Sequence, residues 1–103
     1  MSRVFAAMLI AASPAMASEL PLERAAELER LVIQDCGSCH GMTMKGGLGP
    51  DIRAETLSGT SADVLAQIVL DGVPGGAMPP WRPLLSEADA QWIAEYLLKE
   101  DAE

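Results

Sequence analysis

Both cysteines of the chain and its only histidine fall within five residues, in the segment Cys36-Gly37-Ser38-Cys39-His40. On a helical turn, residues three positions apart share a face, so both thiols can add to the two vinyl groups along one edge of a porphyrin. The adjacent imidazole then points under the ring and can ligate its iron. The segment has the C-x-x-C-H pattern of covalent attachment of one c-type haem through two thioethers. With only 103 residues and 4% aromatic residues, the chain has a thin core that such a cofactor would complete.

Three other interpretations of the paired cysteines are a thioredoxin-like dithiol, half of a zinc site and a structural disulfide. A thioredoxin-like domain needs βαβ patterning, which this sequence lacks. A zinc site with four ligands needs another cysteine or histidine, and the chain has neither. The residues therefore favour haem attachment over these three.

The sixth iron ligand cannot be a second histidine, so it is a methionine, another group or an open position. Met42 and Met44 follow His40 closely, and at most about 14 Å of extended backbone links His40 to Met44. That path would have to turn around the macrocycle, so we expect both methionines to pack in a loop or at the haem edge. Met78 lies in a segment with two glycines before it and two prolines after it. We expect Met78 to ligate the iron, and the alternative is a methionine that only fills a loop.

The hydrophobic pattern contains no alternating strand-like run and predicts an all-α fold. A first helix is expected to begin near Pro21 and to lead into Cys36. A long, glycine-rich loop should follow through residues 42–58. The apolar residues that define the first helix are Leu22, Leu28, Leu31 and Val32.

Two further helices are expected after this loop. Thr60 or Ser61 should cap a middle helix that ends at Gly72. Ser86 should begin the last helix, with Asp89 in an acidic variant of the capping box. The apolar stripe of the middle helix consists of Val64, Leu65, Ile68 and Val69. The expected buried side of the last helix consists of Trp92, Ile93, Tyr96 and Leu97.

Residues 1–17 have the features of a cleaved secretory signal. Arg3 is a minimal positive region, Val4 to Ala12 is a short apolar run, and Ala15-Met16-Ala17 is a small-x-small cleavage site. The alternative, an N-terminal anchor helix, is disfavoured because the run falls short of the roughly 20 residues of a membrane span. The residue directly after the cleavage site is Ser18 and not a cysteine that could carry a lipid. Residues 18–103 are therefore expected to form a periplasmic monohaem domain, exported by the Sec route without a permanent anchor.

Acidic residues dominate the charge, with fifteen Asp and Glu against seven Lys and Arg and a formal net charge of −8. This balance argues against nucleic acid as a partner. We expect a monomer that meets other periplasmic redox proteins.

Taken together, these segments resemble the small class I cytochromes c, and the resemblance covers essentially all of residues 18–103. It implies three main helices and loops wrapped around one covalently attached haem, with His40 and Met78 as iron ligands. The segments that carry it are C-x-x-C-H at 36–40, Gly49-Pro50, Ile68 to Gly72, Met78-Pro79-Pro80, Leu85 to Asp89, Ile93 and Tyr96-Leu97.

The resemblance also assigns two residues of the loop after the haem motif. Pro50 matches the proline whose carbonyl accepts a hydrogen bond from Nδ1–H of the ligating imidazole, which would fix the His40 tautomer and strengthen its donation to iron. The alternative is a proline that only turns the chain. Ile52 stands where many members have leucine, and it is expected to contact the haem.

Within that family, the segments at 36–50 and 77–86 are most similar to the NirC-type monohaem cytochromes that accompany the haem d1 nitrite reductase of denitrifying bacteria. This implies a one-electron carrier, not an enzyme, that delivers electrons to that reductase. One alternative is an accessory redox protein for haem d1 maturation or reductase assembly. Another is a haem protein with a labile sixth ligand that binds small gases.

Overall fold

The computed structural model of the chain describes residues 20–99. The expected signal at 1–17 and the start of the expected domain at Ser18 lie outside these residues. Within residues 20–99 all regular structure is helical, which confirms the all-α fold expected from the sequence. No helix in this range is long and apolar enough to cross a membrane.

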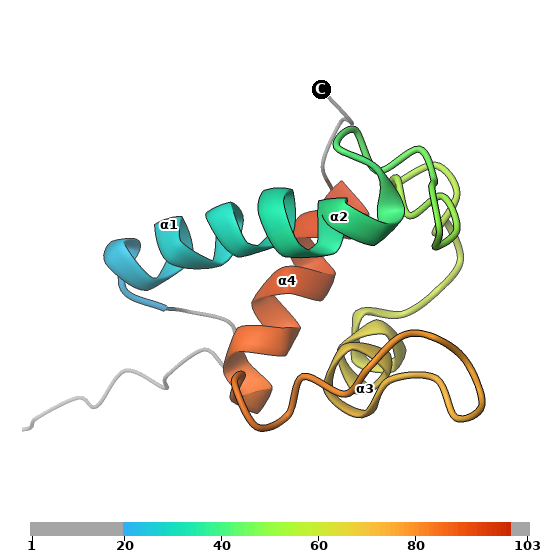
Figure 1. Ribbon diagram of the computed structural model, residues 1–103. Coiled ribbons are helices and arrows are strands. Elements are labelled where there is room, and N and C mark those ends of the chain that lie inside the picture. The colour runs from blue at the N-terminus through green and yellow to red at the C-terminus, as the bar shows by residue number, and fades with distance from the viewer. Residues whose placement is uncertain (1–19, 100–103) are drawn as a thin grey trace, which may run out of the picture.

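The first helix is continuous through three consecutive segments, α1 (Leu22–Leu31), η1 (Val32–Cys36) and α2 (Gly37–His40) (Figure 1). Pro21 precedes it, as predicted, and its carbonyl accepts from Ala25 N–H at 3.0 Å. The middle segment, η1, is a π-helix, which the sequence pattern did not predict.

Helix α3 (Ala62–Asp71) begins and ends at the predicted residues. Ser61 caps it by accepting a hydrogen bond from Val64 N–H at 3.2 Å, and Gly72 follows its last residue. Of the residues in the predicted apolar stripe, Leu65 and Val69 are buried. Val64 and Ile68 are 52% and 36% exposed. Helix α3 packs against α4, and this contact buries the side of α3 that carries Ala66 and Leu70 together with Leu65 and Val69.

Helix α4 (Glu87–Lys99) starts with the predicted capping box. Ser86 N–H donates to Asp89 Oδ2, and Asp89 N–H donates to Ser86 Oγ, both at 3.0 Å. Among the four residues expected to be buried, Ile93 and Leu97 are in the core. Trp92 and Tyr96 are half-buried, and their rings stack with centroids 5.1 Å apart.

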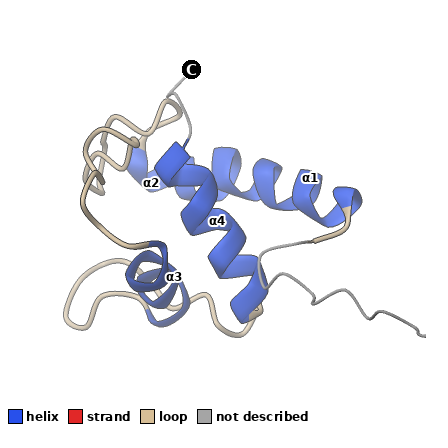
Figure 2. Cartoon of the chain, turned by 180° about the vertical axis from the view of Figure 1, so that it is seen from behind, coloured by secondary structure: helices blue, strands red, loops and turns tan. Residues whose placement is uncertain are grey.

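The core forms where α4 crosses the first helix and packs against α3 (Figure 2). Two fully buried alanines on α4, Ala90 and Ala94, allow the helices to approach closely. The largest fully buried side chains are Leu28, Val32, Leu70 and Ile93.

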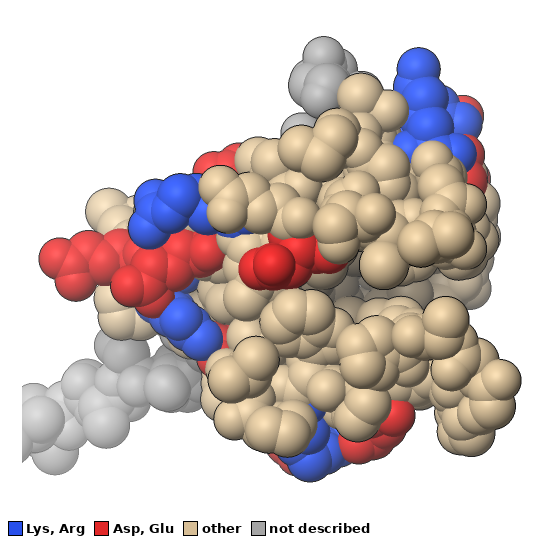
Figure 3. All heavy atoms as spheres, in the orientation of Figure 1, with Lys and Arg blue, Asp and Glu red and all other residues tan. Residues whose placement is uncertain are grey.

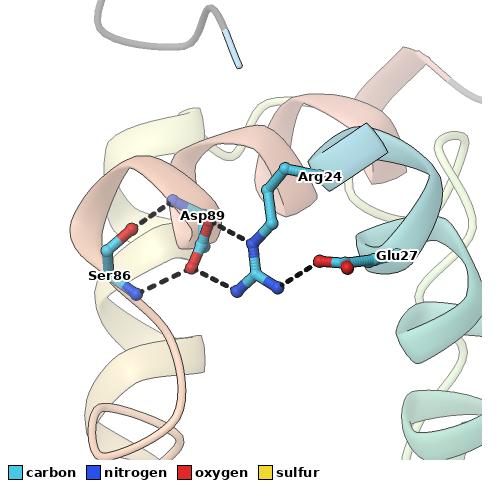
Figure 4. A network of polar contacts seen from close by, with 4 residues as sticks. All are labelled: Arg24, Glu27, Ser86 and Asp89. Carbon is cyan, nitrogen blue, oxygen red and sulfur yellow. Dashed lines mark hydrogen bonds and ion pairs between the residues drawn. The ribbon is translucent and has the colours of Figure 1, made fainter. Parts of the chain in front are cut away.

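A partly buried ion pair joins the start of α1 to the start of α4 (Figure 4). Arg24 donates from Nε and Nη2 to the two carboxylate oxygens of Asp89, at 3.1 and 2.7 Å, and from Nη1 to Glu27 at 2.9 Å. The side chain of Asp89 is only 9% exposed, and the bonds from Arg24 hold its pKa below the usual value. Asp89 therefore caps α4 and fastens it to α1 with one carboxylate.

We predict that Asp89→Asn lowers the free energy of unfolding by about 2 kcal/mol at neutral pH, because hydrogen bonds to a charged group are lost. The lowered folded-state pKa means that this stabilisation is present above the unfolded pKa of about 3.9 and is lost as the pH falls through the folded value. The gap between native protein and variant should therefore close on acidification. Guanidinium unfolding followed by circular dichroism at several pH values measures it.

Asp63→Asn is the matched control, since Asp63 is an exposed acidic residue in the first turn of α3. Its loss should cost less than about 1 kcal/mol. Equal losses for the two variants would contradict a special role for Asp89.

Candidate functional site

The C-x-x-C-H segment lies at the C-terminal end of the first helix. Cys36 is half-buried, Cys39 is exposed, and neither thiol takes part in a disulfide. Burial, aided by the charges of Asp35 and Cys39, raises the pKa of Cys36 to about 11. The attacking thiol of a thioredoxin-like dithiol has a lowered pKa, so this environment does not suit that chemistry.

The loop after α2 folds back on His40. Gly46 N–H donates to the His40 carbonyl and Gly49 N–H donates to the Cys39 carbonyl, both at 2.7 Å. This return brings the carbonyl oxygen of Pro50 to 2.7 Å from Nδ1 of His40. A carbonyl can only accept, so Nδ1 carries the proton and Nε2 keeps its lone pair. The imidazole is thus held in the tautomer that can ligate a metal through Nε2.

Gly49 lies against the His40 ring. The resemblance pointed to the Gly49-Pro50 segment, but the sequence reasoning did not identify the steric need for glycine. A Cβ at this position would lie 2.7 Å from both Cε1 and Nδ1 of the imidazole. Real Cβ contacts are essentially never under 3.0 Å, so only glycine fits without a shift. The available signal was its position directly before Pro50, since the residue that precedes the accepting carbonyl must pass close to the ring.

The other three expected residues of this loop lie together. Met42 Sδ would be 3.4 Å and Met44 Cε 3.6 Å from a Cβ at Gly37, so both side chains lie against the Gly37 side of α2. Ile52 N–H donates to the Met44 carbonyl at 2.9 Å, and Ile52 is partly buried against the core. All three line a small cavity of about 150 Å³. They fit the packing role expected for the two methionines, and contact between Ile52 and a haem stays a prediction.

Met78 lies in a loop that is fastened to the C-terminal end of α3. Val73 N–H donates to the Met78 carbonyl at 3.3 Å. A Cβ at Gly72, whose φ is +72°, would lie 2.6 Å from that same oxygen, so glycine is required there. Met78 itself is half-buried and packs against the core.

The far end of this loop returns to the same helix. Trp81 and Arg82 N–H groups donate to the carbonyls of Val69 and Leu70, at 3.2 and 2.9 Å. Arg82 also binds both carboxylate oxygens of Asp71, at 2.9 and 3.0 Å. The segment that carries Met78 is therefore closed at its base.

An open groove of about 430 Å³ runs along α3 on the side away from its buried face. It ends at Gly72, where the Met78 carbonyl packs. Figure 3 shows the face of the molecule drawn in Figure 1, which is hollowed between its upper and lower parts. The residues that line the groove are Asp63, Val64, Gln67, Ile68, Asp71 and Gly72.

The residues of the C-x-x-C-H segment and of the loop that follows it fit a covalently bound haem. The free thiols lie on one helical turn, the tautomer of His40 leaves Nε2 available, and Gly49 provides the close backbone approach. Val64 and Ile68 are exposed apolar residues on α3. None of Cys36, Cys39, His40 and Met78 lines the groove along α3.

Comparison with known proteins indicates the family of the chain. The family model described as "Cytochrome C oxidase, cbb3-type, subunit III" matches residues 23–97. The chain is 50% identical to "Cytochrome c55X" of Paracoccus denitrificans (strain Pd 1222), over 100% of both chains. Among solved structures it is similar to "c-type cytochrome NirC", with 43% identity and a TM-score of 0.77 over 81% of this chain and 98% of that one.

The chain is also similar to a small part of a larger protein, "Dihydro-heme d1 dehydrogenase NirN in complex with DHE". The identity is 32% and the TM-score 0.64, over 69% of this chain and 15% of that one.

The helical fold with C-x-x-C-H at the end of its first helix is that of a cytochrome c. The chain belongs to the c-type cytochromes, within the family described as cbb3-type cytochrome c oxidase subunit III. The resemblance to class I cytochromes c, and to the NirC-type proteins among them, is thereby confirmed. Membership in this family implies haem c as the cofactor.

We predict that Gly49→Ala displaces the His40 ring and breaks its bond to Pro50. The added methyl group overpacks the site, at a cost of about 1–3 kcal/mol in the free energy of unfolding. Guanidinium unfolding and the NMR shifts of the His40 ring protons in the holoprotein report the two effects.

Gly76→Ala is the matched control in another loop. Its Cβ would meet the Val73 side chain at 3.2 Å, where a flexible group can move, and Gly76 does not have a positive φ. It should leave the His40 signals unchanged. Unshifted His40 signals in Gly49→Ala would show that the ring tolerates a side chain there.

Proposed function

We propose that the chain is a periplasmic one-electron carrier with a single haem c, covalently attached and ligated by His40 and Met78. The observation that carries this proposal is the 2.7 Å bond between His40 Nδ1–H and the Pro50 carbonyl, which leaves Nε2 free for iron. Cys36 and Cys39 would form the thioethers. The haem, when bound, supplies reversible one-electron oxidation and reduction of its iron.

The chain's own residues support carrier chemistry over substrate chemistry. Pro50 holds the orientation of the His40 imidazole, and the loop of residues 72–82, which is hydrogen-bonded to α3 at its base, would hold Met78 as the second ligand. His40 is the only histidine, so no second imidazole is present to act as a distal acid-base group. With two protein ligands, the haem iron would keep the same coordination in both oxidation states, which would limit rearrangement during electron transfer.

The names of the relatives support a role in denitrification. NirC-type cytochromes accompany the haem d1 nitrite reductase, so we propose that the chain delivers electrons to that reductase. A second candidate is electron transfer during haem d1 maturation. It is favoured by the similarity to part of a dihydro-haem d1 dehydrogenase.

The cellular placement belongs to the same proposal. Residues 1–17 would be removed as a Sec signal, which leaves residues 18–103 as a monomeric carrier in the periplasm with no permanent membrane anchor.

We predict that Met78→Ala retains covalent haem, because the thioethers are untouched, but loses the ferric charge-transfer band of a methionine–iron bond and has a lower midpoint potential. Carbon monoxide should then bind the reduced variant without denaturant. Optical spectra and redox titration measure these changes.

Met44→Ala is the control, and it should keep both the band and the potential, because Met44 packs against Gly37. Loss of the band in Met44→Ala would show that the assignment of Met78 as the ligand is wrong. Carbon monoxide binding by the native reduced protein would favour the gas-binding alternative.

We predict that electron transfer from the reduced holoprotein to a haem d1 nitrite reductase is steered by the acidic surface. Raising the ionic strength from 0.01 to 0.1 M shortens the Debye length from about 30 to about 10 Å, so the bimolecular rate should fall clearly over this range. Stopped-flow mixing at several salt concentrations measures it. A flat or rising profile would remove charge steering.

Two variants locate the steering charge. Asp35 is exposed and adjoins Cys36, whereas Glu23 is exposed at the other end of the first helix. Asp35→Asn should slow the reaction at low salt more than Glu23→Gln, because a partner is expected to approach the edge of the haem.

A further inference from the structure

The spacing of the first helix conflicts with an unbroken α-helix. Leu28 and Val32 are four residues apart, fully buried, and define the face that packs into the core. His40 follows Val32 by eight residues. At about 100° per residue, eight residues of α-helix overshoot two turns by about 80°. An unbroken α-helix that buries Leu28 and Val32 would therefore turn His40 well away from their face.

The structure removes this mismatch within η1. Gly37 N–H donates to the Val32 carbonyl, a bond that spans five residues. The bonds on either side are of the α type, since Val32 N–H reaches Leu28 and Gly41 N–H reaches Gly37. One π turn holds an extra residue, which offsets about 100° of rotation and leaves His40 within about 20° of the Val32 direction.

The pattern of buried and exposed residues after the π turn matches a helix rotated by the extra residue. Gly37 is buried and Ser38 is exposed. In an unbroken α-helix, Gly37 would lie opposite the Leu28 face and would be the exposed residue of the two. Gln34 and Asp35 lie in the wider π turn that accommodates the extra residue, and both are exposed.

We propose that the π turn at Val32–Cys36 is a positioning device that sets the rotational phase of the haem-attachment segment relative to the core face of α1. This inference rests on the proposed function, because the group being positioned is the iron-ligating imidazole. With the π turn, the face that packs on α4 and the face that presents His40 coincide, so Pro50 and Gly49 can meet the ring while Leu28 and Val32 stay buried. Without it, either the core contacts or the His40 contacts would be lost.

Deletion of Gln34 tests the phase directly, because it shortens the π turn to an α turn. The variant should retain covalent haem, since C-x-x-C-H is intact. It should lose the methionine–iron charge-transfer band and shift to a lower midpoint potential. Gln34→Ala, which keeps the length, should match the native protein in both. A deletion variant with the native band and potential would overturn the proposal.

Deletion of Ala26 separates phase from stability. Ala26 is exposed on α1, and its loss rotates Arg24 away from Asp89 without changing the residues between Leu28 and His40. It should lower the unfolding midpoint while the band and potential stay native. If it removed the band as the Gln34 deletion does, general destabilisation would explain both results and the proposal would be wrong.

If the Gln34 deletion variant cannot be produced in folded form, the π turn can be tested in the native holoprotein. Scalar coupling across hydrogen bonds in NMR should connect the Gly37 amide to the Val32 carbonyl. Coupling to the Ile33 carbonyl would mean an ordinary α turn and would overturn the proposal. If the native protein itself lacks the methionine–iron band, the proposed ligation fails, and this coupling still decides whether the π turn is present.

Discussion

The hydrogen bond from His40 Nδ1–H to the Pro50 carbonyl is the constraint on which the site depends. It requires the loop after α2 to fold back at once, and two backbone bonds to the carbonyls of Cys39 and His40 close that return. It also requires Gly49 to pass against the ring without a side chain. One short contact thereby fixes the tautomer of the imidazole, the path of ten residues and the identity of a glycine.

The remainder of the fold supports this contact from two sides. The crossing of α1 and α4, fastened by Arg24 and Asp89, holds the helix that carries C-x-x-C-H. The packing of α3 on α4 holds the base of the loop that carries Met78. The segments that carry His40 and Met78 are thus built on different helices that share α4 as a common support.

Sequence reasoning worked where a pattern acts over a few residues. The capping box at Ser86 and Asp89, the cap at Ser61 and the stop at Gly72 were all predicted, because each depends on neighbours within one helical turn. It did not show that Val64 and Ile68 would be exposed, since a 3.6-residue repeat identifies an apolar face but not the neighbour that covers it. In this chain the apolar surface of α3 is divided between the protein core and an exposed groove.

By itself the sequence determined the chemistry: two thiols and an imidazole at attachment spacing, a single distant methionine between glycines and prolines, and three helical segments. Only the tertiary structure decided how these parts face one another. The π turn before Cys36, the contact of Gly49 with His40 and the partly buried pair of Arg24 and Asp89 all depend on residues brought together by packing. Helix propensity cannot specify them, because a one-residue change of helical phase is decided by which side chains become buried, and that depends on contacts between distant parts of the chain.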